Sequence, residues 1–405
     1  MFILNTSTDY RKPLEPEHVE LLNVAAAEKV RRHLDHRDRH AVTPLVSLPG
    51  LAAEIGVAAI QIKDEAHRLG LGSFKALGGA YAVIELVLEE AANILGRPVD
   101  ISELRSQPVR EIAEKMTFAC ATDGNHGRSV AQGAQLVGGR AAIFVHSGVS
   151  EGRIAAIAGF GAEMIRVAGN YDQSVQEAAR VAKRHAWTIV SDTSWSGYER
   201  IPGLVMQGYT ALVREALETM PEMPTHVFIQ SGVGGIAAAV AGHLALSLGE
   251  RRPIFTVVDP ARAACLFETA RAGHPVTVPH GEPTIMAMLE CYAPSPVAWR
   301  ILSRVADGFM TVDEEDAISV MRRLAHPTAG DRAIVAGESG GVGLAGLMKA
   351  VADPAIRSAL SIDESARIFL VNTEGATDPI KYEEIVGLSP AAVTAPQATH
   401  AGSDI

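Results

Sequence analysis

The sequence predicts an α/β fold built on open, mainly parallel sheets flanked by helices. Short apolar runs typical of strands alternate with longer segments of helical periodicity, which is the pattern of βαβ units. The strand-like runs are residues 116–121, 141–146, 163–167, 188–191, 225–230, 254–259 and 367–372. Ligands of such sheets bind beyond the carboxyl ends of the strands. Loops that follow these runs are therefore the first candidates for a site.

Composition narrows the class of protein. The chain has 405 residues, of which 47% are hydrophobic and 20% charged, so it is long enough for two or three globular domains. Its net charge of -11 argues against nucleic acid or an anionic membrane as a partner. No apolar stretch approaches the roughly 20 residues of a membrane span, and residues 1–13 lack the pattern of a secretory signal. We therefore expect a cytoplasmic protein.

The cysteines and histidines of the sequence predict neither a disulfide scaffold nor a metal site. The three cysteines, Cys120, Cys265 and Cys291, are too few for a disulfide scaffold, and Cys120 ends an apolar run that predicts a buried residue. We expect Cys265 and Cys291 to be reduced thiols, and a labile bridge near the entrance of a site is the alternative. Three histidines within residues 33–40 lie among Arg and Asp residues, which predicts a solvated helix face without metal.

The segment Gly72-Ser73-Phe74-Lys75 places a lysine at the start of an apolar helical run. Burial there would remove part of the hydration of the ammonium group and so lower its pKa. A neutral amine is a nucleophile that forms a Schiff base with an aldehyde cofactor. Most lysines at helix starts are solvated surface residues, so the motif gains weight only from the two segments described next.

Two glycine-rich segments each follow a strand-like run. The first is residues 121–128, Ala-Thr-Asp-Gly-Asn-His-Gly-Arg, and the second is residues 231–236, Ser-Gly-Val-Gly-Gly-Ile. Glycines in such a turn let backbone N–H groups converge at a helix N-terminus, where the partial positive charge suits a phosphate. A single loop of this kind is often only a tight turn. The order of lysine, Asn-bearing loop and phosphate loop is much more specific.

This order of motifs resembles that of the fold type II pyridoxal-phosphate enzymes, the group that contains threonine dehydratase, serine racemase and the β-chain of tryptophan synthase. The resemblance covers residues 43–379 and is closest to the diaminopropionate ammonia-lyase branch. Its further motifs are Ser191-Asp192-Thr193, Gly197-Tyr198, Ile201-Pro202, Met206-Gln207-Gly208-Tyr209, Gly337-Glu338-Ser339-Gly340-Gly341 and residues 372–378. The resemblance implies two open twisted sheets, a large domain of residues 1–84 and 200–405, a small mobile domain of residues 85–199, and a homodimer.

The resemblance also implies pyridoxal 5′-phosphate as the cofactor and assigns residues to it. Lys75 would hold the resting Schiff base and, once the amino acid has released it, act as a base at Cα. Asn125 would hydrogen-bond the ring oxygen of the cofactor, and Glu338 would lie near it, with a structural role for Glu338 as the alternative. Thr373 is the expected partner of the pyridine nitrogen, with Glu374 as the alternative. The phosphate would be held by Ser231, Gly232, Val233, Gly234 and Gly235.

Two aspartates are candidates for the chemistry at the substrate. Asp123 stands where threonine dehydratase and serine racemase carry serine, and its carboxylate would lie on the cofactor face opposite Lys75. Two bases could then remove the Cα proton from either enantiomer; the alternative is a turn or N-cap aspartate. Asp192 is the candidate partner for a β-ammonium group, and its alternative is a turn residue. We expect Thr122 and Tyr198 to contact the substrate, with core packing as the alternative for Tyr198.

The expected reaction is an α,β-elimination of D- and L-2,3-diaminopropionate to pyruvate and two molecules of ammonia. A dehydratase of serine or threonine is the runner-up, and Asp123 separates the two because a hydroxyl leaving group needs a proton donor. A β-replacement synthase is the third possibility. A catalytically silent cofactor-binding protein is disfavoured by the joint presence of Lys75, Asn125 and the phosphate loop.

Overall fold

A computed structural model describes residues 1–122, 124–328 and 330–395 and contains two open sheets. The larger sheet has the strand order β1 (Phe2–Leu4), β10 (Gly308–Val312), β9 (Ile254–Pro260), β8 (His226–Gln230), β11 (Arg367–Asn372), β3 (Ala59–Asp64) and β2 (Leu45–Ser47). Its edge strands β1 and β2 run antiparallel to their neighbours, and the other pairs are parallel. The smaller sheet is parallel and has the order β6 (Glu163–Val167), β5 (Arg140–His146), β4 (Thr117–Ala121) and β7 (Thr188–Ile189). The predicted fold class is confirmed.

Helices cover both sheets. They are α1 (Pro16–Leu22), α2 (Val24–Asp35), α3 (Pro49–Ile55), α4 (Lys75–Leu95), α5 (Gln107–Ala113), α6 (Asn125–Val137), α7 (Glu151–Ala158), α8 (Tyr171–His185), α9 (Arg200–Thr219), α10 (Gly235–Leu248), α11 (Cys265–Ala272), α12 (Pro296–Val305), α13 (Glu314–Ala325), α14 (Val342–Ala352), α15 (Pro354–Ala359), α16 (Pro379–Val386) and α17 (Pro390–Thr394). Short 3₁₀ segments are Glu65–Gly70, Ile101–Glu103, Gly249–Arg251, Ala261–Ala263 and Ala287–Leu289.

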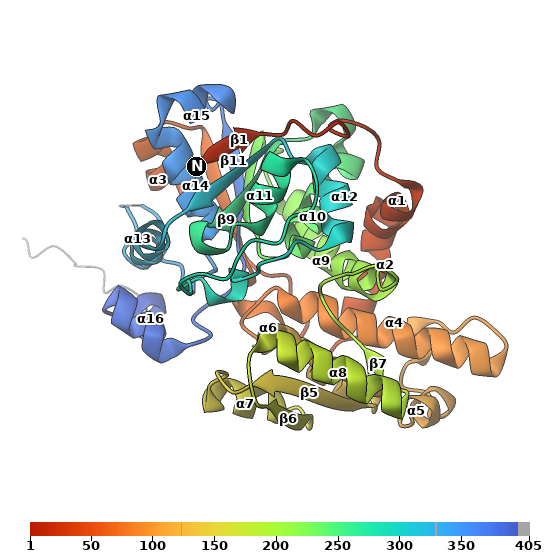
Figure 1. Cartoon of the computed structure of the whole chain (residues 1–405). Coiled ribbons are helices and arrows are strands. Elements are labelled where there is room, and N and C mark those ends of the chain that lie inside the picture. The colour runs from red at the N-terminus through yellow and green to blue at the C-terminus, as the bar shows by residue number, and fades with distance from the viewer. Residues whose placement is uncertain (123, 329, 396–405) are drawn as a thin grey trace, which may run out of the picture.

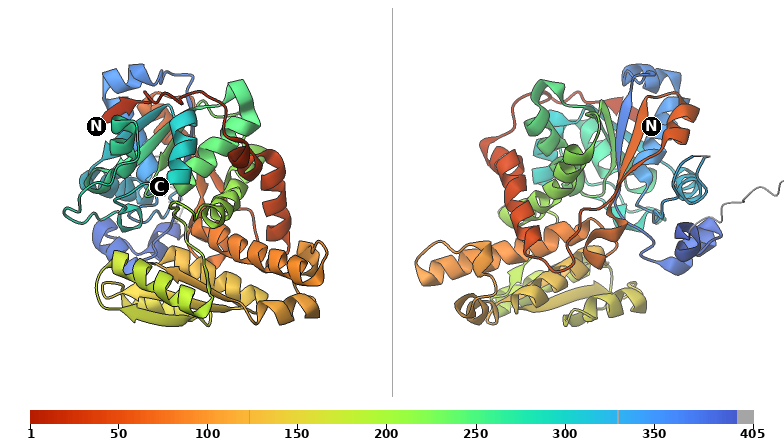
Figure 2. Two further views of the ribbon diagram at one scale, coloured as in Figure 1. Left: turned by 45° about the vertical axis from the view of Figure 1, so that its right-hand side comes forward. Right: turned by 180° about the vertical axis from the view of Figure 1, so that it is seen from behind.

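Helix α4 lies between the two sheets and packs against α6 and α9 (Figure 1). The two further views in Figure 2 keep the smaller sheet on one side of α4 and the larger sheet on the other. Small residues allow this close packing. A Cβ atom on Gly78 would lie 2.7 Å from Cγ1 of Val205 on α9, and one on Gly133 of α6 would lie 2.8 Å from Cα of Ala80. The first residue of this central helix is Lys75, so the lysine lies where the two sheets meet.

The two sheets share one hydrophobic core, which includes Phe118 and Val145 of the smaller sheet and Val227 and Val371 of the larger one. All strands of the smaller sheet come from residues 117–189. The predicted boundary between residues 84 and 85 falls inside α4, which is one continuous helix. The division into a large and a small mobile domain stays a prediction.

Other sequence-based expectations had mixed outcomes. Cys120 is buried as predicted, and the described residues, which include all three cysteines, contain no disulfide bond. The solvated helix face predicted for residues 33–40 was wrong at His33 and Arg37, which are 4% and 8% exposed. Nε2 of His33 lies 2.6 Å from Oε1 of Glu85, and Arg37 donates to Ala76 O at 3.0 Å, so both side chains face α4. No helix within the described ranges is both long and apolar enough to cross a membrane.

Candidate active site

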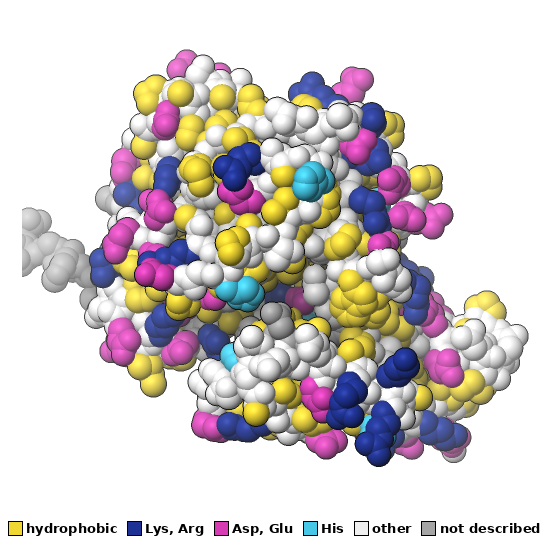
Figure 3. Space-filling view, viewed as in Figure 1, with side chains coloured by type: hydrophobic (Ala, Val, Ile, Leu, Met, Phe, Trp, Pro, Cys, Tyr) yellow, Lys and Arg dark blue, Asp and Glu magenta, His cyan; other side chains and the backbone are white. Residues whose placement is uncertain are grey.

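The position of Lys75 is set by a short pairing between two segments far apart in the chain. Phe74 N donates to Thr373 O at 3.0 Å, and Gly375 N donates to Gly72 O at 3.0 Å. Residues 373–375 directly follow β11, so this pairing holds the start of α4 against the carboxyl edge of the larger sheet. The lysine therefore lies at the edge where parallel sheets bind ligands. We call each sheet together with the helices that cover it a unit. Figure 3 shows that the face of the molecule is hollowed between the larger and the smaller unit.

Lys75 forms an ion pair with Asp192. Nζ of Lys75 contacts Oδ2 of Asp192, and the two side chains are 20% and 16% exposed. Burial lowers the pKa of Lys75, but the negative charge of Asp192 outweighs burial and raises that pKa above its ordinary value. The lowered pKa predicted from burial alone was therefore wrong. Burial raises the pKa of Asp192, but the charge of Lys75 outweighs burial and holds it well below its usual range.

His126 is the third polar side chain at this ion pair. Its Nδ1 lies 4.0 Å from Oδ2 of Asp192, and its Nε2 lies 2.9 Å from Val190 O. Burial lowers the pKa of His126, so the ring is neutral near pH 7. A neutral ring that donates Nε2–H to Val190 leaves Nδ1 unprotonated on the side of Asp192.

The Asn-bearing loop is held by the side chain of Thr122. Its Oγ1 accepts hydrogen bonds from Gly124 N at 3.1 Å and from Gly127 N at 3.2 Å, which closes the turn into α6. Asp123 lies outside the described residues, so its place relative to Lys75 stays a sequence-based prediction. The side chain of Thr122 is 5% exposed, and its predicted contact with the substrate stays a prediction too.

Asn125 and Glu374 form a buried pair across the two sheet units. Nδ2 of Asn125 donates to Oε2 of Glu374 at 2.7 Å. Burial, together with the negative charge of Glu338, raises the pKa of Glu374 to about 7. Glu338 has a cation nearby, since Nζ of Lys381 lies 3.5 Å from its Oε1. The carboxyl group of Glu374 is therefore balanced between its neutral and charged forms at neutral pH.

Thr373 uses its hydroxyl group within the protein. Oγ1 accepts a hydrogen bond from Nε2 of Gln230 at 3.0 Å and lies 3.4 Å from Ser339 O, to which it donates. Gln230 also donates to Val371 O at 3.0 Å and accepts from Gly343 N at 3.1 Å. The choice between Thr373 and Glu374 as partner of a pyridine nitrogen stays a prediction. Sequence reasoning missed Gln230, whose signal was an amide at the end of an otherwise apolar strand.

The glycine-rich loop of residues 231–235 forms a cradle at the N-terminus of α10. Gly234 has a φ of 108°, a left-handed conformation that favours glycine. A Cβ atom on Gly232 would lie 2.9 Å from Sγ of Cys291, and one on Gly234 would lie 2.8 Å from Cβ of Ala298. Oγ of Ser231 is buried without a hydrogen-bond partner among the described residues. A helix N-terminus that carries such an unused hydroxyl group fits a phosphate.

The residues at this edge fit pyridoxal phosphate. Lys75 supplies an amine, and the loop of residues 231–235 fits a phosphate. Asn125, which lies between them in the sequence, supplies an amide. The structure thus brings together the predicted residues Lys75, Asn125, Asp192 and Glu374. This fold and this site define the class of protein as a pyridoxal-phosphate-dependent enzyme.

Comparison with known proteins agrees with this class. The family model described as "Pyridoxal-phosphate dependent enzyme" matches residues 37–374. The chain is 40% identical over 351 residues to diaminopropionate ammonia-lyase of Escherichia coli (strain K12), covering 85% of this chain and 87% of the relative. It is 36% identical over 378 residues to diaminopropionate ammonia-lyase of Salmonella typhimurium, covering 91% of this chain and 93% of the relative.

Solved structures give the same result. Holo diaminopropionate ammonia lyase from Escherichia coli superposes with a TM-score of 0.87 at 36% identity and covers 98% of each chain. Its complex with an aminoacrylate-PLP azomethine reaction intermediate gives a TM-score of 0.85 at 36% identity, covering 97% of this chain and 98% of that chain. The chain therefore belongs to the pyridoxal-phosphate-dependent enzymes, in the family of the diaminopropionate ammonia-lyases. Pyridoxal phosphate is its cofactor.

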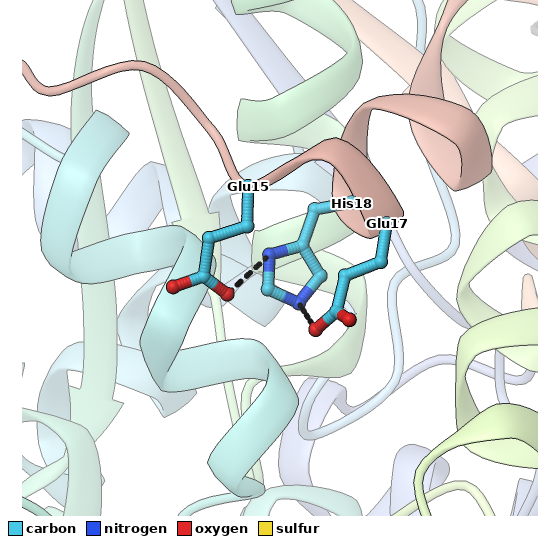
Figure 4. A group of neighbouring side chains, drawn as sticks. All are labelled: Glu15, Glu17 and His18. Atoms are coloured by element: carbon cyan, nitrogen blue, oxygen red, sulfur yellow. Dashed lines mark ion pairs between the residues drawn. The ribbon is translucent and has the colours of Figure 1, made fainter.

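A separate cluster of Glu15, Glu17 and His18 lies at the start of α1 (Figure 4). Nδ1 of His18 lies 3.6 Å from Glu15, and Nε2 lies 3.6 Å from Glu17. The same two carboxylates face Arg300, and Glu15 also pairs with Arg304 at 2.8 Å. Two guanidinium groups beside the carboxylates compensate their charge, so the cluster fits an ion-pair network between α1 and α12 better than a metal site.

Proposed function

We infer that this chain is a carbon–nitrogen lyase that removes both amino groups of 2,3-diaminopropionate and yields pyruvate and two molecules of ammonia. The observation that carries this inference is the match to diaminopropionate ammonia-lyase along 85% of this chain and 87% of the relative. The contact between Lys75 and Asp192 supports it, because an anionic residue beside the catalytic amine suits a substrate with a second ammonium group.

Bound pyridoxal phosphate supplies an electron sink that stabilises negative charge at Cα of the amino acid. The residues of the chain would hold the cofactor by three groups. The loop of residues 231–235 would receive the phosphate, Asn125 would donate to the ring oxygen, and Lys75 would hold the aldehyde carbon. Thr373 is the proposed partner of the pyridine nitrogen, with Glu374 as the alternative.

Lys75 acts as the base that removes the Cα proton, and Asp192 holds the β-ammonium. In the structure the two are paired, and the pair keeps the Lys75 pKa above its ordinary value, so the amine holds its proton. With the cofactor bound, Lys75 would hold its aldehyde carbon until the amino acid frees the amine, and a β-ammonium that pairs with Asp192 would keep the freed amine from this partner. Burial then becomes the stronger influence and favours the neutral amine that can accept a proton. The β-nitrogen stays protonated until it leaves, so ammonia is the leaving group.

Asp123 is proposed as the base on the opposite face, which would let the enzyme act on both D- and L-2,3-diaminopropionate. This proposal rests on the sequence motif, in which a carboxylate precedes Gly124 and Asn125. We propose that Thr122 contacts the substrate through the same loop.

The test is an absorbance scan of the purified protein and an assay of pyruvate formation from each enantiomer. We expect a visible band of lysine-bound cofactor and pyruvate from both enantiomers. Pyruvate or another keto acid from serine or threonine alone would overturn the lyase in favour of a dehydratase. Lys75→Ala should abolish both the band and pyruvate formation. A matched control is Lys349→Ala, which removes a lysine paired with Asp313 and Asp316 and should keep both signals.

We also propose that the enzyme is a cytoplasmic homodimer with a small mobile domain of residues 85–199. The low cysteine content of the sequence supports a reducing compartment. The continuous smaller sheet within residues 117–189 supports a unit that moves as one body. Light scattering after gel filtration tests the dimer, and a mass of one chain would refute it.

A further inference from the structure

Asp192 lies on a segment without regular secondary structure, between the end of β7 at Ile189 and the start of α9 at Arg200. A carboxylate on such a segment faces its partner reproducibly only if neighbouring groups fix its backbone. We propose that Tyr198 is a positioning residue whose hydroxyl group holds the backbone in front of Asp192. This proposal rests on the proposed function, because the carboxylate that Tyr198 positions is the one assigned to the β-ammonium.

The hydroxyl group of Tyr198 bridges two backbone groups just before Asp192. It donates a hydrogen bond to Ile189 O at 2.8 Å and accepts one from Ser191 N at 3.0 Å. Burial raises the pKa of Tyr198, so the group keeps the proton that it donates. The residue between these two contacts, Val190, is fixed by other partners.

Val190 is anchored to both neighbouring elements of the smaller unit. Its N–H donates to Ala119 O on β4 at 2.8 Å, and its carbonyl oxygen lies 2.9 Å from Nε2 of His126 on α6. The four consecutive backbone groups from the carbonyl of Ile189 to the N–H of Ser191 are therefore all bonded. The bonds to residues 189 and 191 both depend on the Tyr198 hydroxyl.

The aromatic ring of Tyr198 is held in place independently of its hydroxyl group. Trp195 and Tyr198 exchange two backbone hydrogen bonds, of 3.3 Å and 2.9 Å, across a turn in which Gly197 has a φ of 81°. The two rings stack with centroids 4.1 Å apart and an interplanar angle of 14°. Replacing Tyr198 by phenylalanine would thus keep the turn and the stack and remove only the bridge to residues 189 and 191.

The segment is fastened on its other side to the larger unit. Oγ of Ser194 lies 2.7 Å from Oγ of Ser295 and accepts a hydrogen bond from Val297 N at 3.1 Å. Ser295 N in turn donates to Val233 O in the phosphate loop at 2.8 Å. The segment that carries Asp192 is thus held at two places. Tyr198 anchors it to the end of the smaller sheet, and Ser194 anchors it to Ser295, beside the loop of residues 231–235.

The hydrogen bonds of the Tyr198 hydroxyl group favour a positioning role over a direct contact with the substrate. A tyrosine hydroxyl has one proton and two lone pairs. In Tyr198 the proton is used by Ile189 O, and one lone pair is used by Ser191 N. A substrate group that needed a hydrogen bond from this hydroxyl would have to displace Ile189 O, so the role as positioning residue replaces the predicted substrate contact in our proposal.

The test is a double-mutant cycle on the holoenzyme between Tyr198→Phe and Asp192→Asn. We expect Tyr198→Phe to lower kcat/KM for 2,3-diaminopropionate on the order of tenfold or more, since small misplacements of reacting groups have effects of this size. In the Asp192→Asn background the same change should have little further effect, because the group that Tyr198 positions is already lost. D-serine has no β-ammonium, so its affinity, measured by titrating the cofactor absorbance, should stay within about twofold.

An equal loss in both backgrounds would overturn the proposal, and so would an equal weakening of D-serine binding. Tyr10→Phe is the matched control, since it also removes a hydroxyl group that donates to a polar partner, Asp307, and it should leave kcat/KM unchanged. If Tyr198→Phe does not fold, Ser194→Ala removes the opposite anchor and should show the same dependence on Asp192.

A second readout keeps this inference separate from the proposed function. Amide hydrogen exchange should speed up in the peptide that contains residues 190–193 in Tyr198→Phe and stay unchanged in Tyr10→Phe. Faster exchange in a protein whose wild type releases no pyruvate from 2,3-diaminopropionate would refute the function and keep the positioning role. Unchanged exchange would refute the positioning role.

Discussion

The buried carboxyl group of Glu374 should make the stability of the protein fall as the pH rises through the weakly acidic range. Its pKa is about 7 in the folded protein, against an ordinary value of 4.5. The folded state therefore holds this proton more tightly than the unfolded chain does. Stability is greatest below the unfolded value, declines between the two values and is lowest above the folded value. The difference between the two values corresponds to about 3 kcal/mol.

Glu374→Gln should remove this dependence, because the amide has the shape of the protonated acid and does not ionise. The assay is urea unfolding of the cofactor-free protein, since the cofactor would add proton linkage of its own. Between about pH 5 and about pH 8 the wild type should lose roughly 2 to 3 kcal/mol more stability than Glu374→Gln. Equal losses in the two proteins would refute the reasoning, because they would show that the carboxyl group has the same pKa in both states.

Glu338→Gln tests the cause of the raised pKa. The charge of Glu338 contributes to it in addition to burial, so its removal should lower the pKa of Glu374 and move the fall in stability to lower pH. A fall at the same pH would assign the whole effect to burial.

Three further substitutions test the roles assigned to the site. Asp192→Asn removes a charge-assisted contact of about 1.5–3 kcal/mol, which predicts a loss of roughly 10- to 150-fold in kcat/KM for 2,3-diaminopropionate; steady-state kinetics with unchanged kcat/KM would contradict the β-ammonium site. Gly234→Ala adds a Cβ atom 2.8 Å from Cβ of Ala298 at a φ of 108°, so titration should show weaker cofactor binding. Gly273→Ala, with a φ of 76° and open space around it, is the control that should bind cofactor normally. Asp123→Ser should abolish pyruvate formation from the D-enantiomer and spare the L-enantiomer, and retained activity on the D-enantiomer would refute the two-base scheme.

Strands with a continuous apolar run were predictable from the sequence, including β6 and β7 at the edges of the smaller sheet, whereas β1, β2, β3 and β10 were missed. All seven strand-like runs form strands, because a buried parallel strand is a continuous apolar run. The missed strands β1 and β2 have three residues each, and they exist through pairing with β10 and β3. β3 alternates apolar and polar residues over only six positions, and β10 begins with a glycine. β10 and β3 pair with β9 and β11, whose residues lie far from them in the chain.

The site was predictable as a set of motifs and unpredictable in its electrostatics. The sequence singles out Lys75, Asn125 and residues 231–235 because each has a local pattern, and their roles toward the cofactor stay predictions. The pKa of Lys75 was predicted in the wrong direction because its partner, Asp192, lies 117 residues further along the chain. The pairing of Asn125 with Glu374 spans 249 residues. Local sequence identifies which groups can react, and the fold decides which charges face them.

Under the proposed roles, the contact between Lys75 and Asp192 would link the choice of substrate to the basicity of the Lys75 amine. An amine that holds its proton cannot accept the Cα proton, and in the structure Asp192 favours the protonated form. A substrate with a β-ammonium would compete for this carboxylate, so its binding would lower the pKa of the freed Lys75 amine and favour its action as a base. A substrate with a β-hydroxyl brings no charge and would leave Asp192 open to the freed amine of Lys75. Selection for 2,3-diaminopropionate over serine would then act on proton transfer as well as on affinity. The ratio of the kcat values for the two substrates should therefore exceed the ratio of their binding constants.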